Sequence, residues 1–408
     1  MAAKGLVHVS SRAEETTVWV VGAKRTAFGA FGGALKSIPT TSLGAVATRG
    51  ALAQAGIPAA AVDHVVFGNV VQAFRNDAYC ARHVGLEAGL PVEVPALTVN
   101  RLCGSGFQAL ISAAQEIGSG HAEVCVAGGT ESMSGTPHVL RGARFGYAFG
   151  KPAPLEDLLW TTLTDERAGC SMGMTAENVA QDHGIGREAC DEYAWSSQRR
   201  WQDAETSGRF AEEIVSIEIP SRAGHELFGR DEHPRPDSGP DKLARLRPVF
   251  KPDGVVTAGN ASGIADGAAA MVVTSRDFGE KNHLTPLARL VSWGVAGVEP
   301  TRMGMGPVPA IQKALERANL SLPEMDLIEV NEAFAAQVLA VEKVAGLPRE
   351  RLNVDGGAIA LGHPLGASGA RIVTHLVYEL RRRRARYGLG AACIGGGQGI
   401  AVILETLL

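Results

Sequence analysis

Four short segments carry the residue types that could do chemistry in this chain. NRLCGSG contains Cys103, EVNEAFA contains Asn331, GGAIALGHPLGASG contains His363, and CIGGGQG contains Cys393. A cysteine thiolate is a strong nucleophile, a histidine can take its proton, and a second thiol can move a proton at carbon. Together these groups suit the formation or cleavage of a carbon–carbon bond next to a thioester.

Cys103 lies in the turn that precedes a predicted amphipathic helix. Free backbone N–H groups and the partial positive charge at a helix N-terminus favour a thiolate, so we expect this position to lower the pKa of Cys103. The glycines beside it would let a large substrate approach the backbone. The glycines at 395–397, which follow Cys393, would expose N–H groups to a developing enolate or oxyanion.

Each of these residues also has a purely structural interpretation when taken alone. Cys103 could be a buried thiol in a turn, His363 could cap a turn, and Cys393 could pack at a strand end. Asn331 could cap the N-terminus of the helix that follows it. The catalytic interpretation therefore depends on the four segments occurring together.

The composition limits the class of protein. Of the 408 residues, 45% are hydrophobic, 20% are charged and 50 are glycine, which is typical of a tightly turned α/β protein. A formal net charge of −4 argues against broad attraction to nucleic acid or to membranes, and no apolar run reaches the roughly 18 residues of a membrane span. Six cysteines without a zinc-type spacing predict free thiols in a reducing compartment.

Apolar strand-like runs alternate with helical patterns, which predicts parallel sheets covered by helices. The strands are expected at 16–24, 62–71, 96–100 and 122–129, and the first helix is expected at 41–55. A second helix is expected after Cys103, and the basic run RRRRAR at 381–386 is expected to be the solvated end of a helix rather than a nucleic-acid site.

An internal repeat appears when the sequence is shifted by 263 positions, from Asp63 to Asp326. The strand AVDHVVFGN then aligns with EMDLIEVNE, and the helix after Cys103 aligns with the helix after Gly366. Two segments that share one offset predict two copies of an αβ half of about 120 residues each.

Residues 134–252 break this pattern because they are rich in charge, tryptophan and proline. We expect an inserted lobe of loops and helices there, with helices near 176–182 and 187–205, that covers a site at the edge of the scaffold. The N-terminal half would comprise 1–133 and 253–285, and the C-terminal half 286–408. The first 15 residues lack an apolar core and contain two glutamates, which favours a short lead-in over a secretory signal or presequence.

The four segments resemble the signature blocks of the thiolases, and the likeness runs from about Val18 to Leu404. NRLCGSG, VTAGNASG, NEAF, GGAIALGHPLGASGARI and CIGGGQGIA stand in the order and spacing of that family. The chain is most similar to 3-ketoacyl-CoA thiolases of the mitochondrial type, through RFGYAFGKPAPLEDLLW, DEHPRP and FKPDGVVTAGNASGIADGAAA.

That resemblance implies a thiolase fold, in which two duplicated αβ halves form a five-layer αβαβα core below the inserted lobe. It also implies CoA-dependent cleavage of 3-ketoacyl-CoA to acetyl-CoA and a shortened acyl-CoA, a reversible Claisen condensation. Cys103 would carry the acyl group, His363 would activate it, and Cys393 would be the acid and base at carbon. Asn331 would hold a water that stabilises the enolate oxygen with Nε2 of His363, and the N–H groups of Cys103 and Gly395 would form a second oxyanion site.

The resemblance further implies that coenzyme A is a substrate and that no metal or prosthetic group takes part. Arg235 and Ser238 would contact its nucleotide end, Ser262 would lie beside the pantetheine, and Met172 and Phe334 would line the thioester channel. Family members are dimers or dimers of dimers, so a homodimer or homotetramer is expected. The implied location is bacterial cytoplasm or mitochondrial matrix.

One position departs from a subgroup of the family. Thiolases specialised for acetoacetyl-CoA usually carry a histidine where AGCSMGMTAEN has Ser171, so a degradative or broad-range enzyme is favoured. The alternative is an acetoacetyl-CoA thiolase that condenses two acetyl-CoA molecules. A condensing enzyme of the ketoacyl-synthase kind would lack the second cysteine, Cys393. A non-catalytic acyl-CoA-binding module would be indicated by loss of Cys103, His363 or Cys393, and all three are present.

Overall fold

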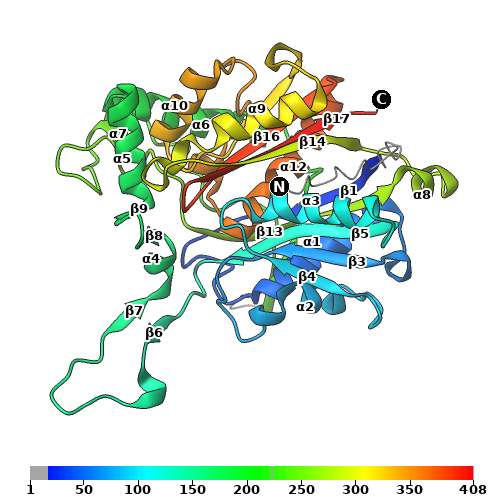
Figure 1. The fold of residues 1–408 in the computed structure, drawn as a ribbon, viewed down its shortest axis with the longest axis horizontal. Coiled ribbons are helices and arrows are strands. Elements are labelled where there is room, and N and C mark those ends of the chain that lie inside the picture. The colour runs from blue at the N-terminus through cyan, green and yellow to red at the C-terminus, as the bar shows by residue number, and fades with distance from the viewer. Residues whose placement is uncertain (1–16, 222–223, 408) are drawn as a thin grey trace, which may run out of the picture.

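The main β-sheet runs through both halves of the chain (Figure 1). In the computed structural model, which describes residues 17–221 and 224–407, β1 (Val18–Thr26) pairs with β13 (Ala265–Ser275) and with β14 (Ala288–Gly297). The strand order is β15-β16-β17-β14-β1-β13-β5-β3-β4. The expectation for the first 15 residues lies outside the described part.

The predicted strands of the first half are confirmed within a few residues. Parallel pairing joins β3 to β4 and β5 in the first half and β15 to β16 in the second. The central strands pair antiparallel, as β1 does with β13 and β14, so the sheet is mixed and the expectation of parallel sheets holds only toward its edges. The remaining main strands are β3 (His64–Gly68), β4 (Ala96–Val99), β5 (Val124–Ser132), β15 (Leu327–Val330), β16 (Tyr387–Ile394) and β17 (Gln398–Glu405).

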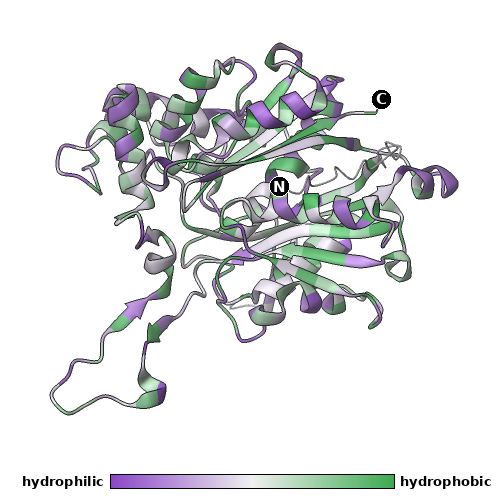
Figure 2. Ribbon diagram, viewed as in Figure 1, coloured by the Kyte–Doolittle hydropathy of each residue, from purple (hydrophilic) through white to green (hydrophobic). Residues whose placement is uncertain are grey.

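Two helices lie between the two parts of this sheet, α3 (Ser105–Gly118) and α12 (Leu365–Arg383) (Figure 1). Side chains of both helices, such as Phe107 and Leu376, share one core with inner-face residues such as Met271 and Val402. In Figure 2 the central strands are mostly hydrophobic, as expected for a sheet covered on both faces.

Four further helices complete the layers. The outer face of the first half is covered by α1 (Thr40–Ala55) and α2 (Cys80–Glu87). The outer face of the second half is covered by α9 (Pro307–Ala318) and α10 (Ala335–Ala345). The order helix, sheet, helices, sheet, helix confirms the predicted five-layer αβαβα core.

The duplication is visible in matching hydrogen bonds. A carboxylate oxygen of Asp63 accepts from two successive backbone N–H groups, at Glu123 (2.8 Å) and Val124 (2.9 Å). Asp326 accepts in the same way, at 2.8 and 2.9 Å, from positions 386 and 387, which lie 263 positions further on. The two halves therefore repeat the same strand-end contact at the offset found in the sequence.

The region between the halves contains α5 (Met172–His183) and α6 (Arg187–Thr206), which confirms both predicted helices. A long arm with β6 (His138–Leu140) and β7 (Leu155–Asp157) projects away from the rest of the molecule (Figure 1). The short elements are β2 (Gly29–Ala30), α4 (Leu158–Thr162), β8 (Thr164–Asp165), β9 (Cys170–Ser171), β10 (Ile214–Val215), β11 (Ile217–Ser221), β12 (Gly224–Phe228), α7 (Pro240–Ala244), α8 (Arg276–Lys281) and α11 (Ala358–Leu361).

The basic run at 381–386 forms the end of α12, as predicted. The helix stops at Arg383, and Arg384 adopts the left-handed conformation that commonly ends helices. Arg382 and Arg383 both pair with Glu379. Among the described residues, no helix is long and apolar enough to cross a membrane.

The close approach of α3 and α12 generates a stability prediction. A Cβ placed on Gly106 would lie 2.3 Å from the backbone nitrogen of Ala370, whereas one on Gly118 of the same helix would meet open space. We expect Gly106→Ala to lower the free energy of unfolding by about 1–3 kcal/mol, because neither backbone can yield. Gly118→Ala is the control and should be neutral or slightly stabilising. Equal denaturation midpoints for the two variants would contradict the packing argument.

Candidate active site

Cys103 lies in a tight turn between β4 and α3. Leu102, the residue before it, has a φ of 46°, which is unusual for a residue with a side chain. The turn is held by three bonds: Leu102 N donates to Oδ1 of Asn100 (2.9 Å), Arg101 N donates to Oγ of Ser105 (2.9 Å), and the Ser105 hydroxyl donates to the Leu102 carbonyl (2.7 Å). The strained conformation is therefore fixed by its surroundings.

The expected pKa of Cys103 is wrong in direction. Burial raises the pKa of the thiol to about 11, although the backbone N–H groups of Gly395 and of Cys103 itself oppose the increase. The reason is that α3 begins at Ser105, so the sulfur lies before the helix, and the half-buried thiol faces an apolar cavity in which the charged form loses hydration. Cys103 thus rests as a neutral thiol and needs a base to become a nucleophile.

His363 can act as that base. Its Nδ1 lies 2.6 Å from Oγ of Ser368, whose own hydroxyl donates to the carbonyl of Pro364 (2.9 Å). Because Ser368 can then only accept from the ring, Nδ1 carries the proton and Nε2 keeps its lone pair. Burial lowers the pKa of His363 to about 4, with a smaller effect from Arg371. The imidazole is neutral and basic at Nε2 near neutral pH.

Asn331 faces His363 rather than capping a helix. Its Nδ2 lies 3.3 Å from Nε2 of His363, and its side chain is fully buried. The interpretation as an N-cap is wrong, because α10 begins at Ala335 and Phe334 occupies the cap position. Within the described part of the chain, Oδ1 of Asn331 has no hydrogen-bond partner. A buried polar atom of this kind is available to a substrate or a water molecule.

Cys393 is the penultimate residue of β16, is fully buried, and lies near Cys103 without lining the cavity that Cys103 faces. Burial raises the pKa of its thiol well above the ordinary value, and the neighbouring Cys103 adds to the increase. Gly395 comes directly after the last residue of β16. Gly396 and Gly397 have φ values of 78° and 79°, which suit glycine. This turn directs the Gly395 N–H toward the sulfur of Cys103.

Cys103 and His363 line one cavity of about 360 Å³. Met172, Ser262 and Phe334 also line it, together with Ser171, so the predicted channel residues lie beside the predicted nucleophile and base. The remaining lining is mostly apolar and includes Met133, Leu159, Phe250 and Leu365. An apolar cavity with a few polar groups is typical of a small-molecule site.

Two predicted residues lie elsewhere. Arg235 and Ser238 belong to the loop after β12 and are absent from the cavity lining. The Arg235 side chain is exposed, and its backbone N–H donates to Oε1 of Gln198 (2.8 Å). Their assignment to the nucleotide end of CoA stays a prediction.

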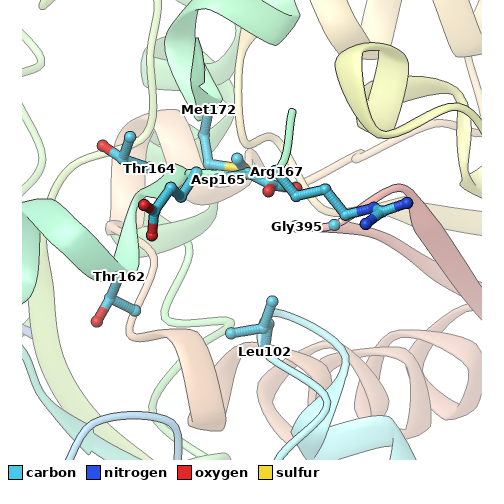
Figure 3. Close-up of a pocket in the computed structure, with 9 residues that line it drawn as sticks. Leu102, Thr162, Thr164, Asp165, Arg167, Met172 and Gly395 are labelled. Atoms are coloured by element: carbon cyan, nitrogen blue, oxygen red, sulfur yellow. The ribbon is translucent and has the colours of Figure 1, made fainter. Parts of the chain in front are cut away.

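A second cavity of about 680 Å³ adjoins the first, and Met172 lines both. Figure 3 shows Leu102, Met172 and Gly395 around it, together with polar residues of the inserted region such as Thr164 and Arg167. A Cβ on Gly395 would lie 3.1 Å from Cδ1 of Leu102 and 3.3 Å from Sδ of Met172. Leu102 and Met172 therefore pack closely around Gly395.

The residues that hold the His363 segment in place carry little signal in the sequence. Ser368 sets the tautomer of His363, and its only sequence signal is its alignment with Ser105 in the repeat. Before His363 in the sequence, the Ile359 N–H donates to the buried carboxylate of Glu332 (3.1 Å). After His363, the Gly366 N–H donates to the carboxylate of Glu131 (2.7 Å). A carboxylate inside an apolar strand end was the available signal for both.

The described residues contain no group of three or more His, Cys, Asp or Glu side chains that could hold a metal ion. All six cysteines are free thiols.

The chain is similar to known proteins along nearly its whole length. Residues 18–277 match the family described as "Thiolase, N-terminal domain", and residues 284–406 match "Thiolase, C-terminal domain". It is 54% identical to the mitochondrial 3-ketoacyl-CoA thiolase of Mus musculus over 95% of this chain and 98% of that protein. It is 49% identical to beta-ketothiolase BktB of Cupriavidus necator over 96% and 99%. The crystal structure of human mitochondrial 3-ketoacyl-CoA thiolase in complex with CoA superimposes with a TM-score of 0.94 at 53% identity, covering 96% and 98%.

The geometry predicts how the reactivity of Cys103 depends on pH and on Ser368. Alkylation by iodoacetamide should rise about tenfold per pH unit toward the pKa of Cys103 (about 11), because the free thiolate reacts, while proton transfer to His363 adds a component that does not depend on pH above the pKa of His363 (about 4). Ser368→Ala removes the acceptor of the Nδ1 proton, so we expect the pH-independent component, measured at low pH where free thiolate is scarce, to fall roughly 10-fold. Ser119→Ala, on the exposed end of α3, is the control. A Ser368→Ala profile that overlays the wild-type profile would refute the tautomer assignment.

Proposed function

The chain belongs to the thiolase family and is a 3-ketoacyl-CoA thiolase, and we propose that Cys103, His363 and Cys393 carry out its carbon–carbon cleavage. One observation supports this above all: a neutral imidazole and a half-buried thiol line the same cavity, and a second, fully buried thiol lies near enough to the first to interact with it electrostatically. A thiolase uses CoA as a substrate, and a relative has been crystallised with it.

The first half-reaction starts with proton transfer from Sγ of Cys103 to Nε2 of His363. The thiolate attacks C3 of the 3-ketoacyl-CoA, and the C2–C3 bond breaks to leave an acyl group on Cys103. The electron pair of that bond becomes the enolate of acetyl-CoA, which takes a proton at C2 from Sγ of Cys393. Because the pKa of Cys393 is raised, this thiol stays protonated until the enolate forms and can then give its proton to C2.

The second half-reaction restores both thiols. Free CoA gives its thiol proton to the Cys393 thiolate and attacks the acyl group on Cys103. The shortened acyl-CoA leaves, and His363 returns its proton to the Cys103 sulfur. All protons are exchanged between these three side chains and the substrates, so we propose that no metal or prosthetic group takes part.

Two places are suited to negative charge on oxygen. The N–H groups of Cys103 and Gly395 already act on the Cys103 sulfur, where an oxyanion on the attached acyl group would form. On the other side, Nδ2 of Asn331 and protonated Nε2 of His363 would stabilise the enolate oxygen, directly or through a water that Asn331 holds. Each donor is positioned before the charge develops.

CoA would reach the thiols through the apolar cavity. We propose that Ser262, Met172 and Phe334 line the pantetheine and thioester, with Arg235 and Ser238 toward the nucleotide. The rings of Phe334 and Phe250 pack edge to face, with their centroids 6.4 Å apart, which supports a rigid apolar wall. The region 134–252 would then form a lobe over a core made of 1–133 with 253–285 and of 286–408.

The preferred length of the acyl chain follows from a residue that lines the first cavity. Ser171 lines the first cavity where a bulkier histidine would narrow it, so we propose that acyl chains longer than acetoacetyl are accepted. Similar proteins include mitochondrial and bacterial thiolases, and six free thiols suit a reducing compartment such as matrix or bacterial cytoplasm.

We also propose a homodimer or homotetramer. Strand β4 is an edge of the main sheet, and in the described chain its outer side has no partner strand. The projecting arm exposes Phe145 (89%) and Phe149 (108%) at its far end. Unpaired edges and exposed aromatic residues are features that association with a second copy would cover.

Substrate turnover tests the assigned roles. Cys103→Ala should abolish cleavage, whereas Cys393→Ser should still be acylated by acyl-CoA but cleave 3-ketoacyl-CoA at least about 100-fold more slowly, because a hydroxyl is a poorer acid at carbon. CoA-dependent loss of acetoacetyl-CoA and of a medium-chain 3-ketoacyl-CoA is measured side by side. Cleavage by Cys393→Ser at the parental rate would rule out its proton-transfer role, and preference for acetoacetyl-CoA would overturn the proposed chain length.

Light scattering tests the arm. Replacing both Phe145 and Phe149 by Ser should reduce the particle mass below that of the wild-type protein, because association with a second copy would bury their apolar surface. Leu227→Ser, which removes an exposed apolar residue (76%) from β12, is the matched control and should leave the mass unchanged. An unchanged mass for the arm variant would show that the arm does not hold the assembly together.

A further inference from the structure

Glu131 is a fully buried carboxylate that the reaction steps above do not use. It lies near the end of β5 in the first half of the chain, close to where His363 enters from the second half. A buried carboxylate needs several donors to compensate for lost hydration, and its donors show what it connects.

Four N–H groups converge on this carboxylate. Oε2 accepts from the backbone of Gly366 (2.7 Å) and of Val70 (3.1 Å). Oε1 accepts from the backbone of Val71 (3.0 Å) and from Nδ2 of Asn69 (3.1 Å). All four partners are donors, so they stabilise the carboxylate form and oppose the effect of burial, which still raises the pKa of Glu131 to about 8. Glu131 therefore ties a segment of the first half to one residue of the second.

The Gly366 bond controls the start of α12 and the position of His363. The helix begins at Leu365, and its cap residue Pro364 offers no side-chain bond, so Glu131 receives an N–H that the helix itself cannot use. A negative charge is also favoured at a helix N-terminus. His363 lies three residues before Gly366.

The Val70 bond leads to the nucleophile. Asn100 donates from Nδ2 to the Val70 carbonyl (3.1 Å), and its Oδ1 accepts from Leu102 N (2.9 Å). Leu102 directly precedes Cys103 and holds the strained φ of the turn. One carboxylate is thus connected by hydrogen bonds to both catalytic loops, which come from different halves of the chain.

We propose that Glu131 is a positioning residue that fixes the Cys103 turn and the His363 loop relative to each other. It acts through Gly366, Val70 and Asn100 and does not touch the substrate. This inference rests on the proposed roles of Cys103 and His363. Proton transfer between those groups requires a short and directed approach, and a misplacement of about 1 Å can cost roughly 100-fold in rate.

The test replaces Glu131 by Gln. Two N–H groups donate to each oxygen of Glu131, so the amide nitrogen of Gln would face one of these pairs and repel it. We expect kcat for thiolysis to fall roughly 10- to 100-fold with KM changed less than about threefold, because binding groups are untouched. Alkylation of Cys103 by iodoacetamide, followed by peptide mass spectrometry, should slow by a similar factor. The control is Asp63→Asn, a carboxylate that accepts two N–H groups at the opposite end of β3, and it should leave both rates unchanged.

A double variant separates positioning from general loosening. If Glu131 acts through His363, Glu131→Gln combined with His363→Ala should be alkylated no more slowly than His363→Ala alone. Multiplying losses, or wild-type alkylation of Glu131→Gln, would overturn the proposal. If Glu131→Gln does not fold, Glu131→Asp, which keeps the carboxyl group but shortens the side chain by one methylene, is measured by the same criteria. Alkylation needs no CoA substrate, so failure of thiolysis in the wild-type protein would count against the proposed function alone.

Discussion

The site depends on the contact between the first turns of α3 and α12. Gly106 and Gly369 bring the two backbones together, since a Cβ on either would lie 2.3–2.4 Å from a backbone nitrogen of the other helix. Cys103 lies two residues before α3 and His363 two residues before α12. The separation of the two helices therefore determines the separation of the proposed nucleophile and the proposed base, and larger side chains at these positions would move the two loops apart.

Burial of this contact also determines the protonation states. Removal from water raises the pKa of the Cys103 thiol to about 11 and lowers that of His363 to about 4, so both rest uncharged. An uncharged pair costs little to bury, and charge appears only when a proton moves between its members. The N–H groups of Cys103 and Gly395 then meet that charge without rearrangement. Stability and reactivity are thus compatible in the same cavity.

The sequence predicted a large part of this arrangement. The strands, α1, the two helices of the inserted region and the duplication were all confirmed, because apolar periodicity and the repeat offset are local or regular signals. The pKa of Cys103 was predicted in the wrong direction, since a helix terminus is visible in sequence and the depth of burial is not. The interpretation of Asn331 as a cap failed for a related reason: its side chain contacts His363, which is 32 positions away in the sequence.

By itself, the sequence determined the element types and the repeat, because these follow from residue type and near neighbours. It also predicted Cys103, His363 and Cys393 as reactive groups, because the four segments that contain the candidate residues occur together. The tertiary structure decided which of these groups meet and what surrounds them. Glu131 and Gly366 are separated by 235 positions, and no periodicity connects them. The bond forms because β5 and the start of α12 pack without intervening side chains, with Gly129 facing Gly366. Contacts of this kind depend on the three-dimensional path of the backbone, which local patterns do not encode.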